Sequence, residues 1–254
     1  MKTKLFILLV LLIFSISGYC LQLTTNGYSD ITHVLHLNEN TGTKAHSTNG
    51  TLTGTSNELT AWVDGVYGSA IYCPADPTNG YFDINTADKL VRIGAFIPYT
   101  LGFWIYIPDT ALDNYWITEW GNVTGNVYSM GVTLRANTQL KIECGNRTAG
   151  GIYTAEFLTS TLTRNKWYFL VITEDNFIIK GYVDGEFQNS DSYVNTITGY
   201  NTANWRVGGT MTWGGYSAGL SFDEVFVITG KELSPSEIKN MYNLSKNYRT
   251  TGGH

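Results

Sequence analysis

Runs of apolar residues, broken by polar turns, divide the chain into short β-strand segments. The clearest run is Trp167–Ile172, which is entirely aromatic, aliphatic or β-branched; a polar turn follows at 174–176 and the apolar pattern resumes at 177–183. Asp184 and Gly185 come next, and this dipeptide tolerates the positive φ angles of a tight hairpin turn. The pattern predicts three adjacent antiparallel strands. The first is apolar on both faces and should lie centrally in its sheet.

Shorter apolar runs recur along the chain at the spacing of an antiparallel sandwich. They predict strands at 31–37, 81–84, 99–107, 115–120, 128–134, 139–143, 152–157, 203–209 and 219–228. Near the C-terminus, Ser234 is a good N-cap, Pro235 suits the first helical position and Glu237 completes a capping box, which predicts a helix to about residue 247. Without an internal repeat, the pattern predicts one all-β domain of two antiparallel sheets over 31–247, with a short C-terminal helix.

The first 20 residues have the pattern of a secretory signal peptide. Lys2 and Lys4 form a charged start, residues 5–14 an apolar stretch and residues 15–20 a small-residue exit. An uncleaved membrane anchor is the alternative, but the apolar stretch falls short of the roughly 20 residues that a spanning helix needs. The protein is therefore expected to be secreted or on the extracellular surface, without a stable membrane span after cleavage.

The cleavage site has two candidates, after Gly18 or after Cys20. Attachment of a lipid to Cys20 is a third possibility, which Tyr19 disfavours because a small residue is expected there. After cleavage, residues 21–30 would form a short lead into the domain and residues 248–254 a flexible tail.

Composition and charge narrow the class of partner. The chain has 254 residues with 27 Gly, 5 Pro and 14% aromatic residues, which fits one large all-β domain. Its formal net charge is −5, and loss of Lys2 and Lys4 with the leader leaves 14 basic and 21 acidic residues, or −7. An acidic protein of this kind is not expected to bind nucleic acid.

Export would expose the chain to glycosylation and to oxidation. Asn-x-Ser/Thr triplets, which chance also produces in a sequence rich in Asn, Thr and Gly, occur at Asn49, Asn122, Asn146 and Asn243. Cys73 and Cys144 remain after processing and could form a disulfide outside the cell. Both lie in apolar, strand-like runs, so a pair of buried free thiols is the alternative.

Four ordered segments resemble concanavalin A-like, laminin-G-like domains. They are the hairpin that opens with Trp167 and ends in Tyr-Val-Asp-Gly, the segment WVDGVYGSAIY at 62–72, the closing GLSFDEVFVI at 219–228 and the helix start at 233–238. The resemblance spans roughly residues 30–245 and implies a two-sheet antiparallel jelly-roll sandwich. The polar segment at 38–55 resembles the opening segment of these domains with one departure: His46 stands where the family usually has Asp.

The sequence lacks the carboxylate pattern of sandwich enzymes that hydrolyse polysaccharides, which place carboxylates at alternating positions of one strand. Asp223 and Glu224 are adjacent and should point to opposite faces, where they are expected to anchor the closing strand through hydrogen bonds. Glu119, Glu143 and Glu156 are single carboxylates on separate predicted strands. We therefore expect no enzymatic activity and no catalytic residues.

Sugar binding needs exposed aromatic faces together with hydrogen-bonding side chains. The candidates lie in two segments and comprise Tyr115, Trp116, Trp120, Trp213 and Tyr216, whereas Trp62, Trp104, Trp167 and Trp205 are assigned to the core. No cofactor is firmly expected. The resemblance leaves Ca²⁺ open, for which Asp76, Asn79 and Asp83 offer hard oxygen ligands.

The sequence thus favours an exported, non-catalytic recognition module that binds glycans or cell-surface glycoproteins. The alternative is a structural subunit on the same sandwich, which self-associates into a homo-oligomer, filament, surface layer or virion component. A fold alone does not decide between them.

Overall fold

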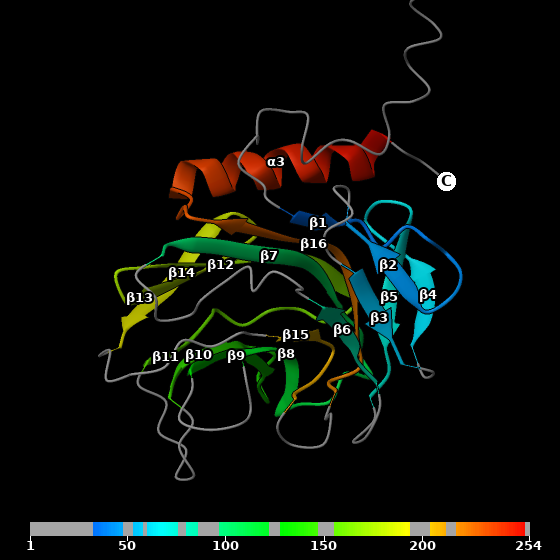
Figure 1. Cartoon of the computed structure of the whole chain (residues 1–254), viewed down its shortest axis with the longest axis horizontal. Helices are drawn as coiled ribbons and strands as arrows, with labels where there is room; N and C mark the ends of the chain where they lie inside the picture. Colours follow the sequence, from blue (N-terminus) through cyan, green and yellow to red (C-terminus); the bar gives the residue numbers. More distant parts are fainter. Residues whose placement is uncertain are drawn as a thin grey trace, which may run out of the picture.

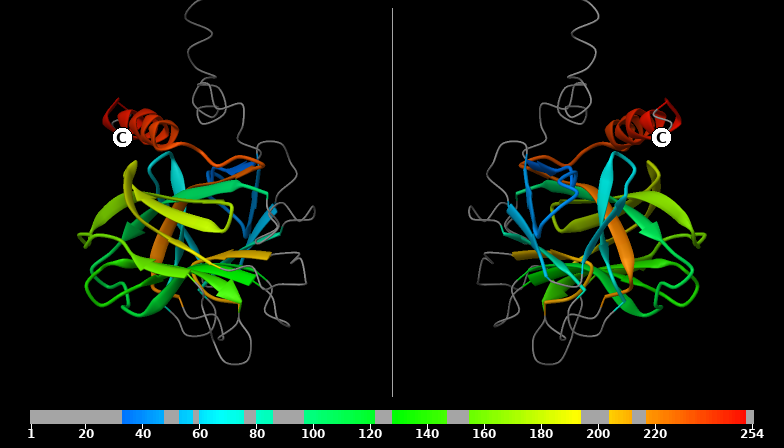
Figure 2. Two further views of the ribbon diagram at one scale, coloured as in Figure 1. Left: turned by 90° about the vertical axis from the view of Figure 1, so that its left-hand side faces the viewer. Right: turned by 90° about the vertical axis from the view of Figure 1, so that its right-hand side faces the viewer.

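A computed structural model describes residues 33–47, 53–57, 60–75, 80–85, 97–121, 128–146, 155–193, 204–211 and 217–251. Its strands form two antiparallel sheets that face each other, and one helix lies across the outer side of one sheet (Figure 1). This is the two-sheet jelly-roll sandwich that the sequence predicted. The view from the side separates the helix, the sheet beneath it and the second sheet (Figure 2).

Sheet A is the sheet that the helix covers. Its order is β14-β13-β12-β7-β16-β5-β4, with β1 also paired to β16. The strands span β1 His33–Leu35, β4 Ala61–Asp64, β5 Ser69–Cys73, β7 Tyr99–Ile107, β12 Lys166–Asp175, β13 Ile178–Val183, β14 Glu186–Ser192 and β16 Leu220–Thr229. The predicted central strand, β12, does lie inside the sheet, between β13 and β7.

Sheet B has the order β11-β10-β9-β8-β15-β6-β3-β2. Its strands span β2 Lys44–His46, β3 Thr53–Ser56, β6 Phe82–Asn85, β8 Tyr115–Gly121, β9 Tyr128–Leu134, β10 Leu140–Asn146, β11 Ala155–Leu158 and β15 Asn204–Val207. Every pairing of these strands is antiparallel. Alternate residues therefore face the sandwich interior and the outside.

The main core fills the space between the sheets with aromatic and aliphatic side chains. Phe103 of sheet A lies 6.4 Å from the ring of Trp205 in sheet B, and Trp205 stacks on Trp120 with ring centroids 4.8 Å apart. Both tryptophans are 1% exposed. Each fully buried apolar side chain of this size stabilises the fold by roughly 1.5–3 kcal/mol.

The predicted hairpin is present, with one adjustment. Asp184 and Gly185 have φ of 53° and 75° and join β13 to β14 as a two-residue turn. The first turn is displaced along the chain, because Asn176 and Phe177 adopt positive φ and β12 continues to Asp175. Phe177 therefore lies in the turn and not in the strand where the pattern placed it.

Helix α3 spans Pro235–Thr251, slightly beyond the predicted end. Its capping box forms as expected: the Ser234 amide donates to Glu237 at 2.7 Å and the Glu237 amide donates to the Ser234 hydroxyl at 3.3 Å. Ile238 and Met241 are buried against the outer face of sheet A. Within the described residues, no helix is long and apolar enough to cross a membrane.

The two cysteines are free and fully buried. Cys73 lies in β5 of sheet A and Cys144 in β10 of sheet B, so the disulfide that the sequence allowed is not formed and the alternative of buried thiols holds. Burial raises the pKa of the Cys73 thiol. Gly208 packs so closely on Cys73 that an added Cβ would meet Sγ at 2.4 Å.

Candidate functional site

The outer face of sheet B brings together residues from both classes of sequence candidate, the aromatic ones and the carboxylates. On β8, Trp116 and Glu119 point outward, opposite Thr133 and Gly131 of β9. Trp116 is half-buried, so part of its ring is accessible. This face therefore combines an aromatic ring with carboxylates.

Two other predicted ligand-binding residues face away from it. Trp120 is 1% exposed and stacks on Trp205 inside the sandwich, and Tyr115 packs half-buried against the same core. The prediction for Trp120 is wrong because a β-bulge between Trp116 and Thr118 shifts the alternation of β8. Tyr115 precedes the bulge and faces the other side from Trp116 by ordinary alternation. Trp116 and Trp120 would share a face in a regular strand, but the bulge places them on opposite faces.

Trp213 and Tyr216 lie outside the described residues. The described residues nearest to them in the chain, Met211 and Ser217, both contact β8. The Met211 amide donates to Glu119 at 2.6 Å, and Ser217 forms a bridge to Trp116. The role of Trp213 and Tyr216 stays a prediction.

Gly131 provides the seat for the Trp116 ring. A Cβ added at Gly131 would come within 2.2 Å of Trp116 Cζ3, so the ring lies directly over the glycine. Only glycine leaves room for a ring at this position on the outer face of the sheet. The result is an aromatic surface fixed above the middle strands of sheet B.

A row of mostly charged residues crosses all eight strands on this face. Strand register aligns, in order, Lys44, Thr55, Asp83, Arg206, Glu119, Gly131, Glu143 and Glu156. Glu119 and Glu143 flank Gly131, with their Cα atoms about 9–10 Å apart by strand spacing. The sequence shows these carboxylates on separate strands; the sheet places them in one row, on either side of the residue that seats Trp116.

Glu119 is held in place by the segment that follows β15. It is 1% exposed and accepts hydrogen bonds from the Thr210 hydroxyl and the Met211 amide. Arg206, its neighbour in the row, donates to the Thr210 carbonyl at 3.0 Å and lies 3.4 Å above the ring of Tyr81. These contacts fix both side chains, so the centre of the row is a preorganised polar surface.

Lys141 links the other end of the row. Its Nζ lies 2.7 Å from Glu143 and 2.7 Å from Glu156. Burial lowers the pKa of Lys141, but the hydrogen bonds with the two carboxylates outweigh this and raise it above its ordinary value. The ammonium stays charged between the two carboxylates. Glu143 is 3% exposed, whereas Glu156 is exposed and can accept hydrogen bonds from the hydroxyl groups of a ligand.

Asp83, a predicted calcium ligand, has another role. Its two oxygens accept hydrogen bonds from Nε and Nη2 of Arg206 at 2.6 and 2.8 Å, in a bidentate ion pair. Asp76 and Asn79 lie outside the described residues. In the described part of the chain, no group of three or more acidic, histidine or cysteine side chains is arranged to hold a metal ion.

The four glycosylation candidates have different positions. Asn146 ends β10, and Asn243 is half-buried in α3. Asn49 and Asn122 lie outside the described residues. Their modification stays a prediction.

A buried polar cluster on sheet A contains His36, Asp223 and Glu224. His36 Nδ1 lies 2.8 Å from Glu224, and Asp223 accepts hydrogen bonds from the amides of Val66 and Tyr67 at 2.7 and 2.9 Å. Asp223 and Glu224 are thus the anchors that the sequence predicted. Burial lowers the pKa of His36, but Glu224 more than compensates and the net shift is upward; burial also raises the pKa of Glu224, which His36 partly offsets.

Comparison with solved structures shows the same fold in several proteins. The chain is similar to the binding domain of Paraclostridial Mosquitocidal Protein 1, with 16% identity and a TM-score of 0.65, covering 85% of this chain and 52% of that one. It is also similar to the botulinum neurotoxin serotype G binding domain, with 14% identity, a TM-score of 0.64 and coverage of 84% and 51%. The chain thus spans about half the length of these toxin domains.

A third similar structure matches over nearly its whole length. It is domain 4 of AbnA, an extracellular arabinanase from Geobacillus stearothermophilus, in complex with arabinotriose. The identity is 20% and the TM-score 0.58, with 84% of this chain and 98% of that one covered. At such identities these likenesses show the fold alone. Comparison with curated proteins gave no match.

The family comparison covers most of the sandwich. The family model described as concanavalin A-like lectin/glucanases superfamily matches residues 76–239, which is more than half of the chain. The match includes the hairpin of β12 and β13, the closing strand β16 and the start of α3. The chain therefore belongs to the concanavalin A-like lectin/glucanases superfamily.

Proposed function

We infer that this protein is a non-catalytic recognition module that binds glycans on the outer face of sheet B. The observation that carries this inference is the Trp116 ring, seated on Gly131 between Glu119 and Glu143. An accessible aromatic face can stack on the C–H groups of a sugar ring, while the exposed carboxylate of Glu156, farther along the same row, can accept its hydroxyl hydrogens. Arabinotriose bound to the similar domain of the arabinanase supports a sugar as the class of ligand.

The setting of the carboxylates favours binding over hydrolysis. A glycosidase needs one carboxyl group that delivers a proton and a second that acts as base or nucleophile. Here Glu119 accepts two hydrogen bonds from Thr210 and Met211, and Glu143 lies against the ammonium of Lys141. Glu119 is 1% exposed and Glu143 3% exposed, so both are enclosed by the protein and neither is placed to deliver a proton to a sugar or to attack it.

The test is a glycan screen followed by calorimetric titration of Trp116→Ala. We expect the purified protein to bind a neutral or basic glycan, arabinan oligosaccharides included in the screen, and Trp116→Ala to weaken that binding about tenfold through loss of stacking. Phe187→Ala is the matched control, because Phe187 is an exposed aromatic residue on β14 of the other sheet, 52% accessible. Unchanged binding by Trp116→Ala would remove this face from consideration.

Light scattering during size exclusion distinguishes the recognition module from a self-associating structural subunit. A recognition module is expected to keep one molar mass over a wide concentration range, with calcium and with a chelator. A mass that grows with concentration, in a protein that binds no glycan, would instead support the self-associating subunit. The exposed edge strand β14 would then be the first interface to block.

A further inference from the structure

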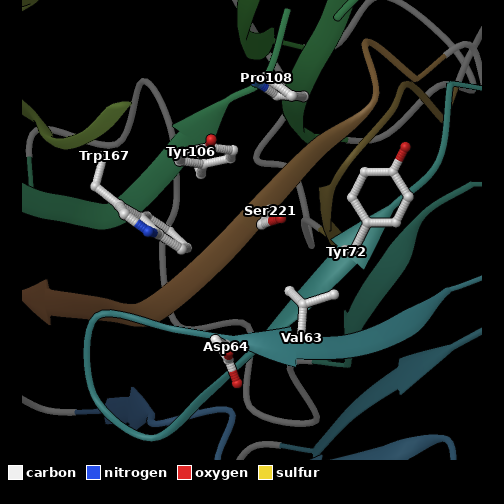
Figure 3. Close-up of a pocket in the computed structure, with 7 residues that line it drawn as sticks. All are labelled: Val63, Asp64, Tyr72, Tyr106, Pro108, Trp167 and Ser221. Atoms are coloured by element: carbon white, nitrogen blue, oxygen red, sulfur yellow. The ribbon is translucent and has the colours of Figure 1, made fainter. Parts of the chain in front are cut away.

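A second accessible aromatic surface lies on the opposite side of the molecule, on the outer face of sheet A. An open pocket of about 320 Å³ is lined by Val63, Asp64, Tyr72, Tyr106, Pro108, Trp167 and Ser221. Figure 3 shows Ser221 of β16 at its centre, between Tyr72 of β5 and Tyr106 of β7, with Trp167 beside Tyr106. We call this pocket the tyrosine groove.

Strand register explains why these side chains line up. Tyr72 pairs with Ser221, Ser221 with Tyr106, and Tyr106 with Trp167, so one cross-strand row forms the floor. The two tyrosines are about 9–10 Å apart at their Cα atoms, with only the small serine between them. The row is thus a shallow groove with an aromatic residue on each side of a hydroxyl.

Strands β7 and β12 carry a second aromatic pair on the same face, and helix α3 covers this second pair. Trp104 and Phe169 have ring centroids 5.3 Å apart, and Tyr242 of α3 packs on both at 6.0 and 6.3 Å. Tyr106 and Trp167 are arranged alike, 5.5 Å apart, yet the pocket lies open above them. Open aromatic patches of this kind mark interaction sites.

The polar groups of the groove also make no hydrogen bonds to other described residues of the protein. In the described part of the chain, the hydroxyls of Tyr72, Tyr106 and Ser221 and the carboxylate of Asp64 have no hydrogen-bond partner. Hydroxyls both donate and accept, so the three match a ligand that is itself rich in hydroxyl groups. A polyproline peptide, which also binds aromatic grooves, offers carbonyl acceptors but few donors for Asp64.

The charge of the groove lining limits which ligands it can bind. The lining has one carboxylate, Asp64, which is exposed, and no cationic side chain. An anionic chain, such as a sulfated or uronic-acid glycan, would meet repulsion without compensation. We propose that the tyrosine groove is a second binding site, which takes a neutral sugar chain lying across Tyr72, Ser221 and Tyr106. It faces away from the site on sheet B and does not depend on it.

The experiment uses Trp116→Ala as the parent, so that the proposed site on sheet B is disabled. Neutral glucose, xylose and mannose oligosaccharides, and a sulfated chain of the same backbone, are titrated by calorimetry. We expect the parent to bind a neutral chain, and an added Tyr72→Ala and Tyr106→Ala pair to weaken that binding about tenfold or more. Phe187→Ala added to the same parent should leave it unchanged. Near-ultraviolet circular dichroism checks that each variant is folded.

Removing the charge of Asp64 gives a second test, because a change in ligand preference would not result from a change in protein stability alone. Asp64→Asn is expected to improve binding of the sulfated chain several-fold while leaving the neutral chain nearly unchanged. Failure of every neutral chain to bind the parent would overturn the proposal. So would equal binding by the tyrosine variants, or a proline-rich peptide bound in place of sugar. If binding to native protein survives Trp116→Ala but is lost in the tyrosine variants, the function proposed for sheet B fails and the groove stands.

Discussion

The two outer faces of this sandwich are built by the same strand alternation but differ in chemistry. The outer face of sheet A is aromatic, with α3 over Trp104 and Phe169 and an open groove beside them. The outer face of sheet B has a row of charged residues with one aromatic ring, Trp116. Strand alternation therefore fixes the core between the sheets, while the chemistry of each outer face depends on what packs over it.

The faces also differ in how they hold a buried carboxylate. On sheet A, Asp223 is fully buried and binds backbone amides, which ties β16 to the turn before β5. On sheet B, Glu119 is equally buried but binds the hydroxyl of the buried Thr210 and the amide of the half-buried Met211. The first carboxylate stabilises the fold, whereas the second orients a surface.

The largest expected effect tests this contrast directly. Asp223→Ala should lower the free energy of unfolding by about 3 kcal/mol or more, because the amides of Val66, Tyr67 and Glu224 lose their acceptor in a buried site. Glu119→Ala should cost less, about 1–2 kcal/mol, since the Thr210 hydroxyl can rotate to another acceptor. Urea unfolding measures both.

A control on the same sheet keeps that comparison specific. Asp175→Ala changes a partly exposed carboxylate at the β12–β13 turn and should shift stability by no more than about 0.5 kcal/mol. Equal losses for Asp223→Ala and Glu119→Ala would mean that the two carboxylates do the same structural work, and the contrast between the faces would be wrong.

Local signals in the sequence predicted the parts of the fold that local chemistry determines. Asp184-Gly185 forms its hairpin turn because both residues tolerate positive φ, and Ser234 and Glu237 form their capping box within one helical turn. Alternation also indicated most strands of both sheets, but not β2 and β3 of sheet B, which lie in a polar segment rich in turn residues. None of these predictions needed to know which strands are neighbours.

The candidate site depended on pairings between distant residues, which the sequence does not show. Arg206 and Asp83 are 123 positions apart and meet only because β15 pairs with β6. The bulge that turns Trp116 outward and Trp120 inward leaves no mark in the pattern of residues. Alternation alone assigns both tryptophans to one face, so sequence inspection could propose the segment but not the residue.

The next effect concerns the seat of Trp116 on sheet B. Gly131→Ala adds a Cβ within 2.2 Å of the Trp116 ring, so the half-buried ring should swing away. We expect a loss of stability of about 1 kcal/mol, at the low end for overpacking because the ring can move. Glycan binding on sheet B should fall about tenfold, while binding in the tyrosine groove is unchanged. Calorimetry of both ligands measures the difference.

Gly42→Ala offers a matched glycine control, since nothing lies within 4 Å of its added Cβ, although its φ of 76° adds some backbone strain. We expect Gly42→Ala to be destabilised to a similar degree and to retain glycan binding. A Gly131→Ala protein that binds sugar as the native protein does would show that the position of the Trp116 ring is irrelevant to recognition.

The smallest expected loss of stability concerns helix α3, which covers the outer face of sheet A. Glu237 caps α3 and pairs with Lys231 at 2.8 Å, and its hydrogen bonds with Lys231 and Ser234 lower its pKa to about 2. A lowered pKa means that its contribution is present above the ordinary value of 4.5 and is lost as the pH falls towards 2. Glu237→Ala should therefore cost about 1 kcal/mol at pH 7 and progressively less below pH 4.5.

Glu237→Gln separates the two roles of this side chain, because the amide can still cap Ser234 but cannot pair with Lys231. We expect it to lose about half as much as Glu237→Ala at pH 7, since the ion pair is partly exposed and screened. Hydrogen exchange should quicken in the first turn of α3 and leave β8 to β10 unaffected, because the helix covers only sheet A. If the amides of sheet B also exchanged faster, the two faces would not be independent surfaces, and one variant could no longer be assigned to one face.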